Sequence, residues 1–405
     1  MKRRVFAAVM AATMLAASLA GCGGSSSSAE GGSGDSAAAE SETVKIAFVG
    51  PMTGDNAFYG ETMLAGVQIA VDEWNEKGGV LGKQIEVVSY DDANTSEQAA
   101  SVAEQIVGDD SISAVIGHFS SGVAMTAAEV YQEAGIPFIN GSAAHMDLAK
   151  IGNCIFRNNA IYATDASSML QIMDYYGIEK FGIINPNTDA GVSVTTEVEN
   201  MIEKFGDKYA PQMVEPQYYE DGTVDFSASV AWFEEQGVQA IYTTGAYAAA
   251  APLIQQYHAI NPDMKFILTS GCFGQEFIDL AGEDAEGCGM ANSFFYGSES
   301  ELVQNFNEKY KAMMDGDNAS TFAGQTYDAA YAVFYAMEAG ESADRASIVE
   351  QLPNTDFEGV TGKITFDEEG NCPKQQVLLE IHNGEYVEVP GALLNQTDYE
   401  AKLGV

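Results

Sequence analysis

From Val44 onward, the sequence alternates short, strongly apolar stretches with longer stretches that have helical periodicity. The apolar stretches have the length of β-strands and contain few polar positions, which is typical of strands buried on both faces. Such strands, when helices separate them, indicate parallel sheets that are covered by helices on both sides. The predicted strands are VKIAFVG, QIEVVSYD, ISAVIGH, IPFIN, CIFRN, KFGIIN, AIYTTG, KFILTSG and CGMANSFFY.

The C-terminal part of the chain has another pattern. Two helical stretches, ELVQNFNEKYKAMM and FAGQTYDAAYAVFYAMEAG, precede the segments GKITFDEEGN and QQVLLEIHNGEYVEV. The last two segments predict an antiparallel hairpin with a polar turn. Residues 43–405 suit two α/β lobes better than one core, because single cores stop growing beyond about 250–300 residues.

The first residues predict a secretion signal over residues 1–21. Three cations, Lys2, Arg3 and Arg4, precede an apolar stretch that is too short for a comfortable membrane span. The stretch ends in Leu-Ala-Gly-Cys, which resembles the cleavage box of bacterial lipoproteins and predicts lipidation of Cys22. The alternative is an ordinary signal peptide that contains a cysteine.

Residues 22–42 follow as a linker of Gly, Ser, Ala and a few acidic residues. A segment of this composition cannot bury apolar surface, so we expect it to behave as a flexible chain. The order of a lipid, a linker and a domain predicts an extracytoplasmic protein anchored to the outer face of the cell membrane. No spanning segment is expected.

The net charge of −41 excludes nucleic acid as a partner, because nucleic-acid binding depends on Lys and Arg side chains that neutralise phosphates. An acidic surface of this strength also opposes binding to anionic lipid head groups. We therefore expect the protein to meet the membrane only through its lipid anchor.

The sequence lacks the motifs of the common enzyme classes. Neither the G-x-S-x-G elbow nor the G-x-G-x-x-G fingerprint occurs, so nucleophilic catalysis and dinucleotide binding are not indicated. No metal-ligand or redox spacing links the histidines and the remaining cysteines. We therefore expect that the protein is not an enzyme, that it has no catalytic residue, and that it binds no metal and no cofactor. The residues concerned are His118, His145, His258, His382, Cys154, Cys272, Cys288 and Cys372.

Two turns have the composition of an anion-binding site. One predicted strand ends at His118, and Ser120-Ser121-Gly122 then opens a helix. The next strand ends at Asn140 and is followed by the turn Gly141-Ser142-Ala143-Ala144. Small residues let backbone N–H groups approach a ligand, and a helix N-terminus favours an anion. Neighbouring strands would bring both turns together as a carboxylate clamp without any arginine. Simple N-capping by serine is the alternative.

These turns and several longer stretches resemble the leucine/isoleucine/valine-binding protein family, the type I periplasmic binding fold that serves ABC importers. The resemblance runs from Val44 to about Tyr386. It includes GPMTGDNAFYGETMLAGVQIAVDEWNEKGGVLGKQIEVVSYDDANTSEQA, VIGHFSSG, GIPFINGSAA, IFRN and TYDAAYAVFYAM.

The resemblance implies an α/β fold of two Rossmann-like lobes with parallel sheets, joined by a three-crossover hinge that closes on a ligand. We place the crossings near Asn158, Ser293 and Lys374. An N-terminal lobe would then hold residues 43–158 and 294–373, and a C-terminal lobe residues 159–293 and 374–405. Cys154 and Cys372 fall near two crossings, so the fold could bring them together as a disulfide, and the sequence alone does not decide this pairing.

The family's polar binding positions map onto the two turns. Ser121 matches the carboxylate-binding serine of the family. Ser142 and Ala143 match positions that approach the ligand through their backbone. The first lobe is thus implied to hold the carboxylate end of a ligand.

The family's aromatic positions map onto three residues. Tyr59 and Phe322 match aromatics that lie over the ligand side chain, and Tyr247 matches a tyrosine of the second lobe. For Tyr59 and Phe322, ordinary core packing is the alternative.

Three positions depart from the branched-chain members. Ala144 replaces a threonine, Ala190 replaces a tyrosine of the second lobe, and Ser270 replaces the glutamate that meets the ligand's ammonium group. The expected ion pair is therefore missing. Asp165 and Asp189 lie in segments that could supply a carboxylate in its place.

The resemblance implies a monomeric substrate-binding protein that captures a small amino acid, branched-chain-like or related, and delivers it to an ABC permease. The alternatives are a ligand-sensing protein that serves a receptor, and a binder of a small carboxylate that is not an amino acid.

The lipoprotein expectation leads to a direct test. Substitution Cys22→Ser should release the protein from membranes without changing its folded domain, because no segment that follows the signal is apolar enough to hold it there. The measurement is fractionation of cells that express the variant, followed by a high-salt wash. Sedimentation of the variant with washed membranes would contradict the lipid anchor.

Overall fold

The computed structural model describes residues 43–220 and 222–405. The predicted signal segment, Cys22 and the linker lie outside this part of the chain. Within the described residues, every helix is too short or too polar to cross a membrane. All four cysteines described are free thiols, so that Cys154 and Cys372 are not joined.

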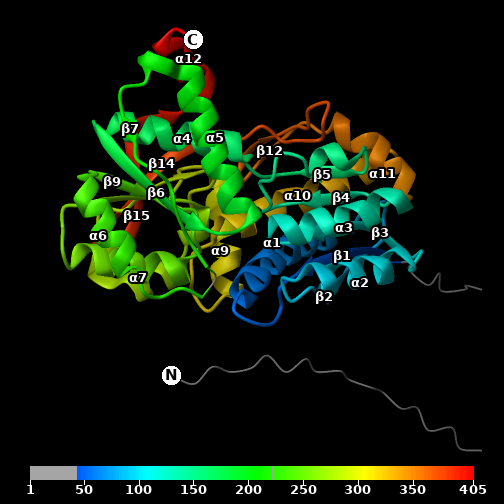
Figure 1. The fold of residues 1–405 in the computed structure, drawn as a ribbon. Coiled ribbons are helices and arrows are strands. Elements are labelled where there is room, and N and C mark those ends of the chain that lie inside the picture. The colour runs from blue at the N-terminus through cyan, green and yellow to red at the C-terminus, as the bar shows by residue number, and fades with distance from the viewer. Residues whose placement is uncertain (1–42, 221) are drawn as a thin grey trace, which may run out of the picture. The chain divides into compact units, whose positions relative to one another are not determined.

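The N-terminal part of the chain forms a five-stranded sheet with the strand order β2-β1-β3-β4-β5 (Figure 1). All of its strand pairs are parallel. The carboxyl ends of its strands therefore lie at one edge, where a parallel sheet places its ligands. The strands are β1 (Val44–Gly50), β2 (Ile85–Asp91), β3 (Ile112–Gly117), β4 (Phe138–Asn140) and β5 (Ile155–Arg157).

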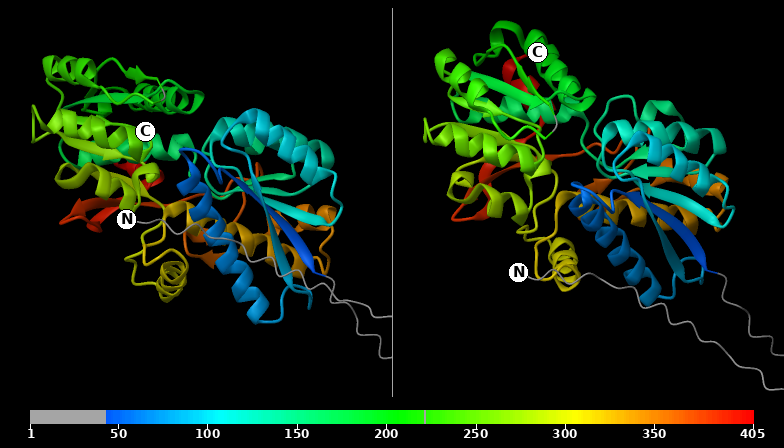
Figure 2. Two further views of the ribbon diagram at one scale, coloured as in Figure 1. Left: turned by 90° about the horizontal axis from the view of Figure 1, so that it is seen from below. Right: turned by 60° about the horizontal axis from the view of Figure 1, so that its bottom comes forward.

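Helices cover both faces of this sheet. Along β1, Ala47 and Val49 pack against α2 and α3, whereas Ile46 and Phe48 belong to the core that contains α1 and α10. This alternation follows from the two-residue period of a strand and explains why the strand is apolar throughout. Figure 2 shows α2 and α3 in cyan on one side of the sheet and α1 in blue on the other. The helices are α1 (Ala57–Glu76), α2 (Ser96–Val107), α3 (Ser121–Ala134) and α10 (Thr321–Ala339).

A second sheet is built from the middle and the end of the chain. Its order is β15-β14-β11-β10-β9-β6-β7, and β8 also pairs with β6. The pairs among β6 to β11 are parallel, whereas β14 is antiparallel to β11 and to β15. The strands are β6 (Lys180–Pro186), β7 (Gln212–Met213), β8 (Gln217–Tyr219), β9 (Ala240–Tyr242), β10 (Lys265–Leu268), β11 (Gly289–Asn292), β14 (Gln376–His382) and β15 (Glu385–Leu394).

Helices also cover both faces of the second sheet. Phe181 and Ile183 of β6 pack with α4 and α5, and Ile184 belongs to the core that contains α6, α7 and α8. These helices are α4 (Tyr162–Tyr175), α5 (Asp189–Phe205), α6 (Ser227–Gln236), α7 (Tyr247–His258), α8 (Gln275–Ala281) and the C-terminal α12 (Gln396–Leu403).

The C-terminal hairpin differs in one respect from the sequence-based expectation. The hairpin lies within the second of the two predicted segments, as β14 and β15 around a turn at Asn383-Gly384. The segment GKITF instead supplies β13 (Gly362–Ile364), which pairs with β12 (Phe357–Gly359). These short strands follow α9 (Glu301–Met313), α10, α11 (Arg345–Gln351) and η5 (Leu352–Asn354).

The chain passes from the first sheet to the second after β5. It leaves the second sheet after β11 for α9 and α10, and it returns to that sheet at β14, which makes three passages. Residues of α10 contact the first two passages: Asn158 Nδ2 donates to the main-chain carbonyl oxygen of Gln325 at 2.7 Å, and Thr321 Oγ1 donates to Asn292 Oδ1 at 2.7 Å. The first and third passages are joined through Arg157, whose guanidinium donates to Asn371. The division into two lobes at these passages stays a proposal.

Helices α1 and α10 pack closely, and this contact determines where Tyr59 and Phe322 lie. Gly66 makes the close approach possible, because a Cβ at this position would lie 2.1 Å from the carbonyl oxygen of Ala323. Thr326 adds a hydrogen bond from its Oγ1 to Met63 O at 2.7 Å.

Substitution Gly66→Ala should therefore lower the free energy of unfolding by about 1–3 kcal/mol, the usual cost of overpacking. Gly122→Ala in α3 is the matched control, since nothing lies within 4 Å of its added methyl group. The control should gain up to about 1 kcal/mol from helix propensity. Urea unfolding measures both variants, and equal effects would contradict the close approach of α1 and α10.

Candidate ligand-binding site

Aromatic side chains from several elements gather beside the carboxyl ends of the first sheet. Tyr59 of α1 is the centre of this aromatic cluster: its ring stacks on Phe119 with the centroids 4.2 Å apart. The rings of Phe322 and Tyr247 lie 5.7 Å and 5.9 Å from that of Tyr59. Phe58 lies 6.1 Å from Tyr247. The structure thus brings together the three aromatic residues predicted from the sequence.

Tyr59 also joins the two sheets through its hydroxyl group. The side chain is 2% exposed, and its OH donates to the carbonyl oxygen of Gly271 at 2.9 Å. Gly271 lies in η3 (Ser270–Cys272), directly after β10. Burial raises the pKa of Tyr59 well above its usual value, so the phenol stays protonated as a donor.

Helix α3 begins at Ser121 and presents an uncapped N-terminus. The preceding residue, Ser120, has extended backbone but makes no side-chain capping bond. The alternative that this serine simply caps the helix therefore does not hold for Ser120. Because the first N–H groups of a helix have no partner within the helix, they remain donors for an anion.

Ser121 contacts a residue that was not among the predicted site residues. Its Oγ lies 2.8 Å from the OH of Tyr162, the first residue of α4. Both side chains are buried, at 8% and 6% exposure. Tyr162 N also donates to the carbonyl oxygen of Ala144 at 3.2 Å, so that Tyr162 is attached to both predicted turns.

The side-chain amide of Asn140 joins the two turns of the predicted clamp. Its Nδ2 donates to the carbonyl oxygens of Gly117 and His118 at 2.7 and 2.8 Å. Its Oδ1 accepts from the N–H groups of Ser142 and Ala143 at 2.9 and 2.5 Å. All four hydrogen-bonding positions of this amide are therefore used.

This arrangement occupies the groups through which Ser142 and Ala143 were expected to approach a ligand. Both amides bond to Asn140, and the carbonyl oxygen of Ser142 accepts from Asn159 Nδ2. The Ser142 hydroxyl lies within hydrogen-bond distance of the carbonyl oxygens of His118 and Phe119, so its one proton is also used within the protein. The direct ligand contacts predicted for Ser142, Ala143 and the neighbouring Ala144 stay predictions.

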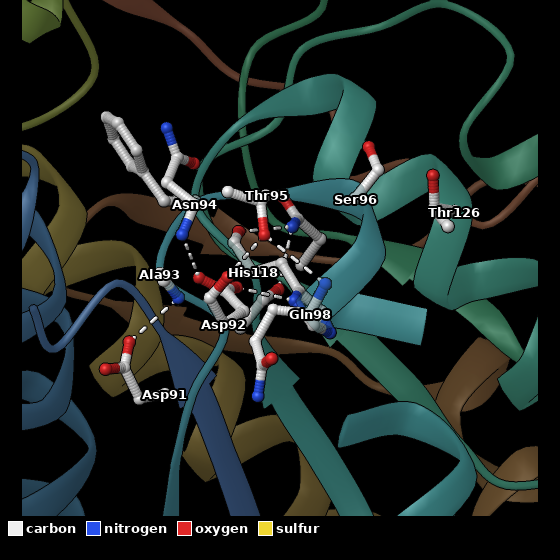
Figure 3. A network of polar contacts seen from close by, with 12 residues as sticks. Asp91, Asp92, Ala93, Asn94, Thr95, Ser96, Gln98, His118 and Thr126 are labelled. Carbon is white, nitrogen blue, oxygen red and sulfur yellow. Dashed lines mark hydrogen bonds and ion pairs between the residues drawn. The ribbon is translucent and has the colours of Figure 1, made fainter. Parts of the chain in front are cut away.

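A buried network of polar side chains supports the first turn. His118 and Asp92 are both 0% exposed and point toward one another, with Nδ1 and Oδ2 2.7 Å apart (Figure 3). The other ring nitrogen lies 3.0 Å from the OH of Tyr131 on α3. Asp92 Oδ1 in turn accepts from Asn94 N at 2.8 Å. This network fixes His118, whose carbonyl oxygen accepts from the second turn.

The residues considered for the ammonium end are spread over the second sheet. Ser270 begins η3 and is half-buried, Ala190 packs beside the α4–α5 core, and Asp189 is exposed. Asp165 of α4 accepts a hydrogen bond from Gln376 Nε2 at 2.9 Å. Burial raises the pKa of Asp165 to about 6. A cation beside this carboxylate would favour its charged form.

Among the described residues, no group of His, Cys, Asp or Glu side chains could hold a metal ion. The imidazole ring of the buried His118 contacts Asp92 and Tyr131 rather than a serine hydroxyl. The arrangement is suited to holding a small molecule by hydrogen bonds and aromatic contact.

Comparison with known proteins agrees with this geometry. A family model described as a periplasmic binding protein matches residues 43–379. The chain belongs to this family. Periplasmic binding proteins bind solutes and are not enzymes, and this chain has their α/β fold with parallel sheets.

Curated relatives of this periplasmic binding protein are named as binders of leucine, isoleucine and valine, in one case also of threonine and alanine. The leucine-, isoleucine-, valine-, threonine- and alanine-binding protein of Pseudomonas aeruginosa is 29% identical over 335 residues, which cover 82% of this chain and 87% of the relative. The Leu/Ile/Val-binding protein of Escherichia coli strain K12 is 27% identical over 337 residues, covering 82% and 88%. The family recognised in the sequence is confirmed.

Two solved structures show the same fold. The branched-chain amino acid binding protein LivJ of Streptococcus pneumoniae, in complex with isoleucine, has a TM-score of 0.78 and 28% identity, and the match covers 86% of this chain and 100% of that one. The leucine-binding protein LivK of Thermotoga maritima has a TM-score of 0.80 and 25% identity, covering 88% and 99%.

Sequence reasoning missed four residues of the site, Phe58, Phe119, Tyr162 and Asn140. Phe119 could have been found, because it lies between His118 and the serine pair in the turn already singled out. Asn140 was noted only as a strand end. The role of Tyr162 depends on a contact 41 residues away in the chain, which no local pattern shows.

The joining role of Asn140 can be measured. Asn140→Ala leaves two amides and two carbonyl groups in the interior without this partner, and should lower the free energy of unfolding by about 3–5 kcal/mol. Ser142→Ala removes only a hydroxyl group from the same turn and should cost about 1 kcal/mol. Urea unfolding at pH 7 compares the two variants, and equal losses would contradict the central position of Asn140.

Proposed function

We propose that this periplasmic binding protein captures a small amino acid, of the branched-chain type or related to it, and delivers it to an ABC permease. The observation that carries the proposal is the position of Ser121. This serine begins an uncapped helix, directly beside the aromatic cluster around Tyr59. A hydrogen-bond donor for a carboxylate, next to an apolar aromatic surface, matches the carboxylate and the side chain of an apolar amino acid.

In this proposal, the carboxylate of the ligand is bound by Ser121 and by the N–H groups of the first turn of α3. These groups donate hydrogen bonds, and the helix N-terminus adds a favourable dipole. The apolar side chain of the ligand would pack against Tyr59, Phe119 and Phe322, which lie within contact distance of one another. Tyr247 closes the same cluster from α7 of the second sheet.

Closure of the two lobes around the ligand is part of the proposal. The ligand would stabilise the closed state by touching elements of both sheets, as Tyr59 and Gly271 already do. We further propose that the protein acts as a monomer at the outer face of the cell membrane, held there by a lipid on Cys22.

A small carboxylate without an amine is the second candidate ligand. Ser270 favours it, because a site built around a glutamate would leave that carboxylate buried without a partner when no ammonium group is bound. A neutral hydroxyl imposes no such penalty. The keto analogue of leucine, 4-methyl-2-oxopentanoate, is therefore included in the test below.

Calorimetric titration with L-leucine, L-isoleucine, L-valine and 4-methyl-2-oxopentanoate tests the proposal. At least one of the three amino acids should bind. Ser121→Ala should weaken its binding by about 1.5–3 kcal/mol, the value of a hydrogen bond to a charged group. Ser120→Ala is the matched control: it removes the adjacent hydroxyl, which makes no capping bond, and should leave the affinity unchanged.

Absence of binding to all three amino acids would contradict the proposed function. Binding of the keto analogue alone would assign the protein to the second candidate. Equal effects of Ser120→Ala and Ser121→Ala would place the carboxylate away from the first turn of α3.

A further inference from the structure

Tyr162 occupies a place that no local sequence pattern explains. It is the first residue of α4, directly after the chain has left the first sheet for the second. Its main-chain N–H group donates to Ala144 O in one predicted turn, and its OH contacts Ser121 Oγ in the other. Tyr162 is thus held against both predicted turns.

Ser121 and Tyr162 form a hydroxyl pair in which one of the two protons has no acceptor within the pair. Each hydroxyl carries one proton, and only one of the two can be used in the bond between them. Within the described part of the chain, neither oxygen has a second hydrogen-bond partner. One buried O–H group is therefore left without a protein acceptor, and buried donors are rarely left so.

A ligand that supplies acceptors at this point would use both protons. A carboxylate has two oxygens and about four lone-pair positions, so that it can accept from both hydroxyls at once. A primary amide could accept from both hydroxyls only at its one uncharged oxygen. Hydrogen bonds to a charged carboxylate are about twice as strong as neutral ones, so two hydroxyl donors favour the carboxylate.

We propose that Tyr162 donates to the carboxylate of the ligand together with Ser121, and that it determines the preference for a carboxylate over a neutral carbonyl group. The inference rests on the proposed function and adds a residue from the second sheet's first helix to the carboxylate clamp. The two hydroxyls bond to each other in the structure, and on ligand binding both turn to the carboxylate.

The surroundings of Tyr162 agree with this role. Burial raises the pKa of its phenol to about 12, so the group is a protonated donor at neutral pH. The N-terminus of α4, like that of α3, has no side-chain cap. Ser121 and Tyr162 are thus each the first residue of a helix that has no capping side chain.

The test compares L-leucine with L-leucinamide in calorimetric titrations of the wild-type protein and of Tyr162→Phe. The substitution removes only one oxygen atom. Tyr399→Phe is the matched control, because its side chain is also 6% exposed and its hydroxyl lies buried without a partner in α12. The free energy of unfolding of each empty protein is measured by urea denaturation.

We expect Tyr162→Phe to weaken leucine binding about 10- to 100-fold, as loss of a hydrogen bond to a charged group should. Leucinamide binding should change by less than about threefold, the scatter of an uninvolved site. Tyr399→Phe should change neither. A merely structural role of Tyr162 would weaken both ligands equally and would lower the stability of the empty protein.

Failure of the inference and failure of the proposed function give different results. If the wild-type protein binds leucine and Tyr162→Phe binds it equally well, the inference is wrong and the proposed function stands. If Tyr162→Phe weakens both ligands equally, the role is structural and the inference is wrong. If the wild-type protein does not bind leucine, the proposed function for leucine fails and the inference fails with it.

Discussion

The side-chain amide of Asn140 is the interaction on which the candidate site depends. It joins the end of β3 to the turn after β4, so that two segments 22 residues or more apart keep one relative position. Behind it, the buried pair of His118 and Asp92 fixes the same turn against α3 and the loop after β2. The first residues of α3 are thereby held ready for a ligand without being contacted by a capping side chain.

The aromatic cluster depends on a different constraint, the packing of α1 on α10. Tyr59 and Phe322 come from segments that are far apart in the sequence, and the close approach at Gly66 brings their helices together. The hydroxyl of Tyr59 then reaches Gly271 in the second sheet. Because one apolar cluster runs from the core around α1 and α10 to that around α7 and α8, a ligand placed at Tyr59 would meet both parts of the domain.

Much of the fold follows from the sequence, for physical reasons. Strands such as Val44–Gly50 are apolar on both faces because helices cover both faces, and that pattern is visible in the residues alone. The hairpin at the end of the chain was predicted, but GKITF was wrongly included in it. Its pairing with Phe357–Gly359 depends on how α10 and α11 return the chain, and a three-residue strand carries no signal for its partner.

The site was predictable where its residues lie in one short segment and hidden where they meet through space. Ser121 and the turn at Ser142 could be chosen because small residues follow the strand ends. Asn140 satisfies four groups at once, and Tyr162 reaches Ser121 from another helix. Neither role leaves a mark on the local sequence. The local sequence also does not show that the Ser142 and Ala143 amides are bonded to Asn140.

The most direct test of this account is a crystal structure of the domain with bound L-leucine. The account predicts that the carboxylate lies within hydrogen-bond distance of the Ser121 hydroxyl and of the first N–H groups of α3. It also predicts that the leucine side chain contacts Tyr59 and Phe322, and that Asn140 keeps its bonds to Ser142 and Ala143. A carboxylate bound by those two amides, with Asn140 displaced and Ser121 without a ligand contact, would contradict it.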